Sequence, residues 1–197
     1  MHAPELPPVL QSKLNVTGGS PVMLSVSQQR VMNPPTRIPI ARIEEYRTHY
    51  VGSKASGGGF MAFVTANVGP LNFAVLSGDG WQNRKKIFSV IHHFDSNGKH
   101  VNSDIETHGT VADGPDVDDA AWATLERKLG EMGDVTYSDI AIEGFRVEHD
   151  DCTFGLLTTE ECGMFDEKED HESMRYRVHL LPNDLLFYPP WTGEYDT

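Results

Sequence analysis

Short runs of apolar residues, separated by turn residues, recur along most of the chain and predict a fold rich in β-strands. Residues 60–66 and 71–76 are short, aromatic and β-branched, and Val68-Gly69-Pro70 between them predicts a hairpin turn. Residues 87–94 form another such run, and Asn97-Gly98 after it predicts a second hairpin because both residues tolerate a positive φ. The return strand and the remaining strands are expected over residues 100–110, 140–148, 153–158, 174–181 and 185–188.

One main amphipathic helix is predicted over about residues 117–132. Trp122, Leu125, Leu129 and Met132 recur at the spacing that places side chains on one face of a helix. The acidic residues just before this run suit the positive end of a helix dipole. We therefore expect one apolar helical face that packs against a sheet.

Residues 40–50 are the ambiguous stretch of the pattern. Ile40, Ile43, Arg47 and Tyr50 share a helical face, and strand alternation fits them less well, so the pattern predicts a short helix. The glycine-rich residues 52–59 that follow are expected to form a flexible loop.

These elements together predict an α+β fold in residues 40–197. We expect an antiparallel sheet of about seven or eight short strands, covered by the one main helix. The alternative is a β-barrel or a sandwich with an inserted helix. No period of 20–50 residues is visible, so a repeat protein is not expected.

Residues 1–39 have the composition of an extended arm. They hold seven of the chain's twelve prolines, and proline resists both helix and central strand because it lacks a backbone N–H and restricts φ. Within the arm only residues 22–26, Val-Met-Leu-Ser-Val, read as a short strand. Such an arm is expected to lie over its own domain or over a neighbouring molecule.

The chain of 197 residues is long enough for one domain with its own core. No stretch approaches the ~20 apolar residues that a membrane span needs, and the first residues lack the basic start and apolar run of a secretory signal. We expect a soluble, cytoplasmic protein that contacts no membrane.

Charge is divided unequally between the two halves of the chain. The formal net charge is −13, which argues against nucleic acid as a partner. Residues 1–94 carry nine bases and four acids, whereas residues 95–197 carry seven bases and twenty-five acids. Either these charges lie on solvated faces, or the acidic half docks a basic partner or gathers a cation.

The two cysteines, Cys152 and Cys162, are too few for a disulfide scaffold. They are ten residues apart across a predicted hairpin, so a single bridge is geometrically feasible, but two free thiols are the simpler expectation. The absence of a Cys-x-x-Cys pair excludes a cysteine-based zinc knuckle.

Histidine and carboxylate residues of one predicted hairpin are the best chemical lead. His92 and His93 are adjacent on a strand, so their side chains point to opposite faces and cannot bind one metal ion together. A cluster of His and Asp on one face would suit zinc, manganese or iron, and scattered exposed side chains are the alternative. No cofactor is expected, but a divalent metal is possible; its candidate ligands are His92, His93, Asp95, His100, Asp104 and His108.

Three aromatic residues are candidates for contact with a protein partner. Trp81 follows a Gly-Asp-Gly turn, Trp191 follows Pro189-Pro190, and Tyr195 lies near the end of the sequence. Tryptophan and tyrosine are enriched in binding hot spots. These side chains either anchor a partner or pack back on the sheet.

The arm, the aromatic residues, the charge asymmetry and the lack of catalytic motifs together favour a non-catalytic binding or assembly protein. It would contact a protein partner or a second copy of itself through the arm, the aromatic carboxyl-terminal segment and the acidic half. One alternative is a metal-dependent hydrolase or oxygen-using enzyme built on the His and Asp residues. The other is a small-ligand carrier, lined by Phe60, Phe63, Phe73, Phe88 and Phe94.

Overall fold

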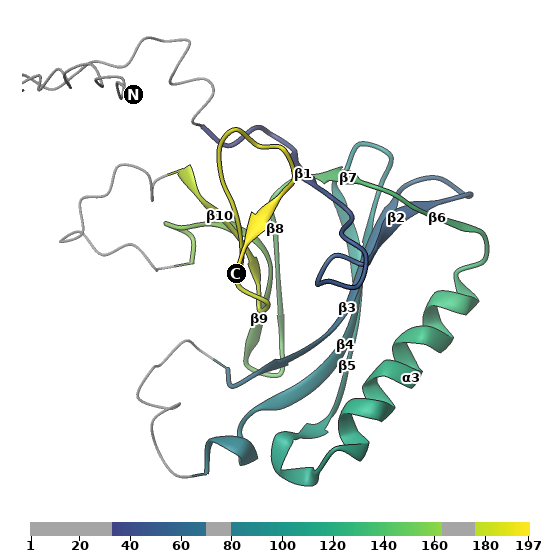
Figure 1. Ribbon diagram of the computed structural model, residues 1–197, viewed down its shortest axis with the longest axis vertical. Coiled ribbons are helices and arrows are strands. Elements are labelled where there is room, and N and C mark those ends of the chain that lie inside the picture. The colour runs from purple at the N-terminus through teal and green to yellow at the C-terminus, as the bar shows by residue number, and fades with distance from the viewer. Residues whose placement is uncertain (1–32, 70–79, 163–175) are drawn as a thin grey trace, which may run out of the picture.

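The computed structural model describes residues 33–69, 80–162 and 176–197, and it arranges them in three layers (Figure 1). Two five-stranded sheets face each other, and one α-helix covers the outer face of the first. Every pair of neighbouring strands is antiparallel.

Sheet I is the sheet that the helix covers, and sheet II packs on its other face. In spatial order sheet I contains β5 (His100–Thr110), β4 (Lys86–Phe94), β3 (Gly59–Asn67), β2 (Tyr50–Lys54) and β6 (Val135–Tyr137). Sheet II contains β12 (Tyr195–Asp196), β11 (Leu185–Phe187), β10 (Val178–Leu181), β9 (Cys152–Thr158) and β8 (Phe145–His149). The other elements are the ribbon of β1 (Ile38–Ile40) and β7 (Ile140–Ile142), helix α3 (Asp116–Glu131), and the 3-10 turns η1 (Trp81–Asn83) and η2 (Val111–Asp113).

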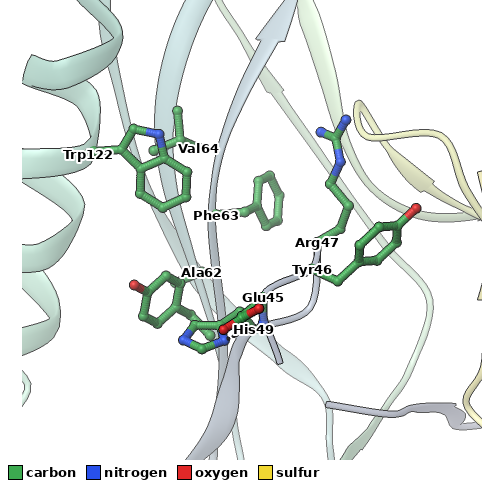
Figure 2. Close-up of a pocket in the computed structure, with 9 residues that line it drawn as sticks. Glu45, Tyr46, Arg47, His49, Ala62, Phe63, Val64 and Trp122 are labelled. Atoms are coloured by element: carbon green, nitrogen blue, oxygen red, sulfur yellow. Dashed lines mark hydrogen bonds between the residues drawn. The ribbon is translucent and has the colours of Figure 1, made fainter. Parts of the chain in front are cut away.

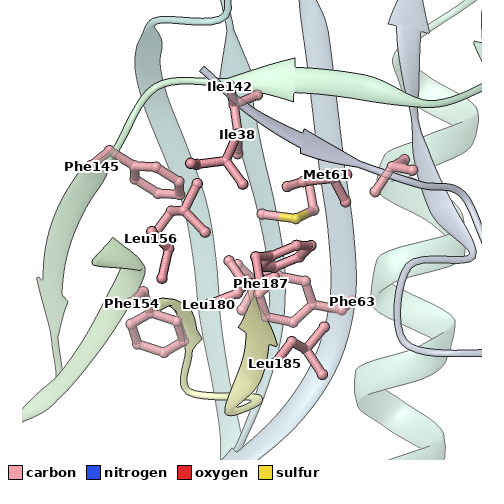
Figure 3. Close-up of a cluster of buried hydrophobic side chains, with 14 of the residues drawn as sticks. Ile38, Met61, Phe63, Ile142, Phe145, Phe154, Leu156, Leu180, Leu185 and Phe187 are labelled. Atoms are coloured by element: carbon pink, nitrogen blue, oxygen red, sulfur yellow. The ribbon is translucent and has the colours of Figure 1, made fainter. Parts of the chain in front are cut away.

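Strand β3 is apolar on both faces because each face lies against a different layer. Successive side chains of a strand point to opposite sides, so Met61 and Phe63 enter the main core between the sheets, beside Leu180 and Phe187 (Figure 3). Phe60 and its same-face neighbours lie beneath α3 in a second cluster. The unbroken apolar run of residues 60–64 is therefore that of a central strand rather than of a half-exposed one.

The second cluster accounts for the position of α3 on sheet I. Leu125 and Leu129 of α3 are buried against Phe60, Ala62 and Ile91 of sheet I. Three acidic residues occupy the first turn of α3, where they face the positive end of the helix dipole. The predicted helix is confirmed.

The predicted fold class is confirmed in its coarse form, and its details are not. The described residues form twelve strands in three sheets rather than seven or eight in one, and they close no barrel. The β4–β5 hairpin is confirmed around the Asp95–Lys99 turn, where the Asp95 amide donates to the Lys99 carbonyl. Residues 71–76, predicted to pair with residues 60–66, lie outside the described residues.

The helix predicted over residues 40–50 is wrong. Ile40 pairs with Ile140 in the small ribbon, and Tyr50 pairs with Ala62 in sheet I. The two ends of the segment thus belong to different sheets, and a turn-rich loop joins them. The apolar spacing comes from separate tertiary contacts, which the periodicity cannot distinguish from one helical face.

Two further predicted boundaries are corrected. Half of the glycine-rich loop predicted over residues 52–59 lies in β2 and β3, and residues 55–58 form the turn between them. The single strand predicted over residues 140–148 is broken at Glu143-Gly144, because β7 pairs with β1 whereas β8 pairs with β9.

The predicted arm was expected to end at residue 39, which lies within β1. Residues 1–32 lie outside the described residues, so the arm stays a prediction.

Candidate functional site

One edge of β3 has no partner strand over the second half of its length. β4 pairs with β3 from Phe60 to Asn67, whereas β2 pairs with it only from Gly59 to Ala62. Within the described ranges, no strand lies beside residues 63–67 on the β2 side. Sheet I therefore presents an open edge five residues long.

The hydrogen bonds of the β2–β3 turn show which way the backbone groups of these strands point. The Lys54 amide donates to the Gly58 carbonyl oxygen at 3.0 Å, so the backbone N–H and C=O groups of Lys54 point toward β3. The direction of these backbone groups alternates from one residue to the next along a strand, so those of Tyr50, four residues before Lys54, also point toward β3. The backbone groups of its partner Ala62 consequently point toward β2.

The same alternation continues into the open part of β3. Val64 and Ala66 direct their N–H and C=O groups toward the open edge, whereas Thr65 directs its groups toward β4. No hydrogen bond joins the edge-facing groups of Val64 or Ala66 to any described residue. They are the donors and acceptors that an added strand would use.

Two adjoining hollows follow this edge and form one groove, which we name the β3 groove. Their volumes are about 460 Å³ and about 350 Å³, and both are lined by Arg47, Val64 and Trp122. Figure 2 shows Trp122 projecting from α3 on one side, and Tyr46 and Arg47 on the loop at the other side.

The two hollows differ in chemical character. The first is mainly aromatic, and its remaining lining residues are Glu45, Tyr46, His49, Tyr50, Ala62 and Phe63. The second is mainly polar, and its remaining lining residues are Thr65, Ala66, Lys85, Asp118, Pro182 and Asn183. The groove therefore pairs a site for an apolar or aromatic side chain with a site for a polar one.

Aromatic contacts hold the helix side of the groove. The rings of Tyr50 and Trp122 have centroids 6.3 Å apart, and Tyr50 and Tyr137 have centroids 5.9 Å apart. The Arg42 guanidinium lies over the Tyr137 ring at 5.5 Å from its centroid. Trp122 itself is 38% exposed, so its ring is both packed and available to a ligand.

A buried threonine holds the loop side. Thr48 is fully buried, its hydroxyl donates to the Ala41 carbonyl at 2.8 Å, and it accepts a hydrogen bond from the Ile43 amide at 3.2 Å. The same hydroxyl lies 3.2 Å from the hydroxyl of Tyr195. The loop before β2 carries Tyr46 and Arg47. The hydrogen bonds of the buried Thr48 side chain hold this loop in place.

The sequence did not point to the groove residues. Trp122 was assigned to the buried face of the helix, yet it lies at the margin of that face and is partly exposed. Tyr46, Arg47 and His49 fell in the segment that was wrongly predicted to be helical. The one available signal was that β3 is much longer than β2, and it becomes visible only once the strand register is known.

Two of the three predicted partner-binding residues pack against the main core. Trp191 and Tyr195 are partly buried and contact this core, and the ring of Tyr195 is tilted against that of Phe187 with centroids 5.6 Å apart. Trp81 begins η1, and Lys85 Nζ lies 5.6 Å from the centroid of its ring. Direct contact of these three residues with a partner stays a prediction.

The predicted opposition of His92 and His93 is seen in the structure. His92 is fully buried between the sheets, whereas His93 lies on the helix-covered face with its Nδ1 3.5 Å from Lys54 Nζ. The other candidates make separate local contacts. The Asp95 carboxylate accepts hydrogen bonds from two amides of its own turn, Asp104 pairs with Lys128 at 2.8 Å, and His108 Nε2 lies 2.9 Å from Ser89 Oγ.

Ser103 joins two of the candidate ligands. Its hydroxyl lies 2.6 Å from Nδ1 of His92 and 2.8 Å from Nε2 of His100. Over residues 33–69, 80–162 and 176–197, no group of three or more His, Cys, Asp or Glu side chains is arranged to hold a metal ion. The metal-dependent alternative stays a prediction that these residues do not support.

His92 is held in its neutral form. Burial, together with the nearby His100 and His93, lowers the pKa of His92 to about 3. Its Nε2 is buried and has no hydrogen-bond partner among the described residues, while the Phe145 ring lies edge-on at 4.8 Å between centroids. His92 thus packs among aromatic rings between the two sheets.

Both cysteines are free thiols, as the simpler expectation had it. They lie at and beyond the two ends of β9 rather than across a hairpin, which removes the geometric reason for a bridge. Burial raises the pKa of each thiol, in Cys162 to about 11, so neither has the thiolate character of a reactive cysteine.

The phenylalanines proposed to line a carrier cavity lie in two separate clusters. Phe63, Phe88 and Phe94 belong to the core between the sheets, whereas Phe60 lies beneath α3. Phe73 lies outside the described residues. Phe63 also lines the first hollow of the β3 groove.

The chain matches no protein-family model, and comparisons with curated proteins and with solved structures give no match either. Across the described residues, no helix combines the length and the apolar character that crossing a membrane requires.

Proposed function

We propose that this protein is a non-catalytic binding or assembly protein that takes an extended segment of a partner protein as an added strand along the open edge of β3. The observation that supports this proposal is the position of the open edge. It forms the floor of a groove with lining residues from both α3 and the loop before β2.

The backbone supplies affinity in this mode of binding. Unpaired N–H and C=O groups at a sheet edge bind an extended chain through main-chain hydrogen bonds, and pockets for alternate side chains supply specificity. Val64 and Ala66 carry the edge-facing groups of β3 in the groove. Most exposed edges are protected by charge, proline or bulges, whereas the side chains of residues 63–66 are apolar or threonine.

The side chains of the groove define the segment that would fit. Tyr46, Tyr50 and Trp122 suit an apolar or aromatic side chain in the first hollow. Arg47, Lys85 and Asp118 offer both signs of charge in the second hollow, which favours a polar residue farther along the strand. The partner segment is therefore extended and mainly apolar, and carries no large net charge.

The aromatic carboxyl-terminal segment has an indirect role in this binding. Tyr195 contacts Tyr46 and Thr48 of the loop that lines the groove. It acts as a positioning residue for the binding surface.

The experiment is peptide selection on the full chain by display of a random-peptide library, followed by calorimetry of the selected peptides. The Ala66→Pro variant removes one edge-facing N–H without removing a bond to β4, and Ala66→Val is the matched control that keeps the N–H. We expect selected peptides to bind Ala66→Pro at least tenfold more weakly than the wild type and to bind Ala66→Val with similar affinity. Equal affinity for the proline and valine variants would overturn the proposal, and so would failure to select any peptide both on the wild type and on Leu24→Asp, in which a charge interrupts the apolar run of residues 22–26.

A further inference from the structure

We propose that the strand that fills the β3 groove is residues 22–26 of a second copy of this chain, so that the protein associates with itself by exchanging its amino-terminal arm. This inference rests on the proposed function, because it names the occupant of the same groove. The hydrophobic pattern, length and point of departure of the arm each support it.

The hydrophobic pattern of the segment fits a groove with two sides. Four of the five residues in Val-Met-Leu-Ser-Val are apolar, which is typical of a strand covered on both faces rather than of an exposed edge strand. The groove has residues that would contact both faces of such a strand. Trp122 and Asp118 of α3 lie on one side of the edge, and Pro182 and Asn183 of the β10–β11 turn contribute to the lining from sheet II.

The length of the segment matches the length of the edge. Five residues of β3, from 63 to 67, lack a strand on the β2 side within the described residues, and the strand-like run of the arm is also five residues long. Pro21 stands directly before the run, and Ser27-Gln28-Gln29 follows it. A proline and a polar tract are suitable boundaries for a short strand that ends where the groove ends.

The rest of the arm is a poor competitor for this site. Prolines at positions 4, 7 and 8 interrupt the beginning of the arm, and each removes a backbone donor that a sheet edge would bind. Elsewhere in residues 1–32 no apolar run is longer than two residues.

The point of departure of the arm favours exchange between two copies. Figure 1 shows the purple segment that begins the described chain on the side of the molecule away from α3. β1 is fixed there by its pairing with β7, and Pro34-Pro35 stiffens the chain just before it. Only residues 27–32 separate the strand-like run from the described chain, and six residues span at most about 20 Å when fully extended, which favours the groove of a neighbour over the groove beside α3 of the same molecule.

The test is native mass spectrometry and sedimentation velocity of the full chain and two variants. Leu24→Asp places a charge in the middle of the arm strand, and Ala66→Pro removes a donor from the groove. We expect the wild type to have at least twice the monomer mass of 21.9 kDa, and each variant alone to be a monomer. Leu24→Ile and Ala66→Val are the matched controls and should keep the wild-type mass.

Mixing the two variants provides the decisive comparison. Leu24→Asp keeps an intact groove and Ala66→Pro keeps an intact arm, so the mixture contains one competent pair and should form a heterodimer. Circular dichroism of each variant checks that it remains folded. If a single variant still self-associates weakly, the mixture remains informative, because its heterodimer should be more stable than either homodimer.

Three outcomes would overturn the inference. They are a monomeric wild-type chain, an oligomer that both variants retain, and a mixture that fails to form the heterodimer. A monomeric wild type is the result expected if a segment of the same chain, such as residues 71–76, occupies the edge. If the wild type is monomeric but selected peptides still bind Ala66→Pro more weakly than Ala66→Val, the edge is free and the proposed function stands without arm exchange. If neither an oligomer nor such peptides are found, both proposals fail.

Discussion

The ring of Tyr195 stacks on the ring of Tyr46, with the centroids 5.9 Å apart and the ring planes at 22°. Its hydroxyl also lies 3.2 Å from Thr48 Oγ1, and burial raises the pKa of the Tyr195 phenol. The last strand of sheet II therefore holds the loop that lines the β3 groove, although more than 140 residues separate the two along the chain.

Tyr195→Ala should lower the free energy of unfolding by about 2 kcal/mol, because it removes a ring that packs on the core and on Tyr46. Tyr195→Phe keeps the ring and should cost about 1 kcal/mol through the hydroxyl alone. The matched control is Tyr188→Ala, since Tyr188 is 43% exposed and should change stability by less than about 0.5 kcal/mol. Urea unfolding measures all three, and equal losses at positions 188 and 195 would contradict this assignment.

The direction of the β3 backbone predicts opposite results for proline at adjacent positions. Ala66→Pro should cost little stability because the Ala66 N–H faces the open edge. Thr65→Pro removes an N–H that faces β4, and should cost about 3 kcal/mol or more. Thermal unfolding of the two variants checks this prediction, and a larger loss for Ala66→Pro than for Thr65→Pro would mean that the deduced alternation is reversed.

His92 should make the protein less stable in acid. Its folded pKa of about 3 lies below the ordinary value of 6.5, so between these values the unfolded chain binds a proton that the folded chain does not. The stabilisation is thus complete above about pH 6.5 and is lost as the pH falls toward 3, at up to about 1.4 kcal/mol per pH unit.

His92→Leu isolates this contribution from that of the carboxylates. Urea unfolding at pH 7 and at pH 4.5 should show a decrease in stability that is about 2 kcal/mol smaller in the variant than in the wild type. His93→Leu is the control, because His93 is only half-buried and should change the decrease less. Equal pH dependence of the wild type and His92→Leu would show that His92 is not the buried neutral group described.

Gly98 should be far less tolerant of substitution than Gly57. Both have a positive φ, but a Cβ on Gly98 would collide with the backbone carbonyl of Ala141, whereas a Cβ on Gly57 would meet open space. Gly57→Ala should cost about 1 kcal/mol through backbone strain alone, and Gly98→Ala on the order of 3 kcal/mol. Unfolding midpoints of the two variants check this, and equal losses would mean that the Asn97-Gly98 turn does not pack against β7.

Several elements were predictable because their signals are local. The hydrophobic stripe of α3 and the Asn97-Gly98 turn of the β4–β5 hairpin depend on residues within a few positions of one another. The opposition of His92 and His93 follows from strand geometry alone. These features were visible because helix spacing, turn conformation and strand alternation need no distant partner.

The division of the chain into two sheets was not predictable in the same way. Ile40 and Tyr50 have the spacing of a helical face, yet each pairs with a strand of a different sheet. Burial in two cores on opposite faces of β3 produces an apolar run that has no period at all. Periodicity reports that a residue is buried but not which partner buries it.

The sequence alone therefore determined that the chain has one amphipathic helix, many short strands and a proline-rich start. Only the tertiary structure decided where an edge stays open, because this depends on β2 pairing as far as Ala62 while β4 continues to Asn67. Strand register comes from contacts between residues far apart in the chain, and such contacts leave no pattern within either strand. The β3 groove is for that reason a product of the tertiary structure, whereas the residues proposed to fill it were recognisable in the sequence.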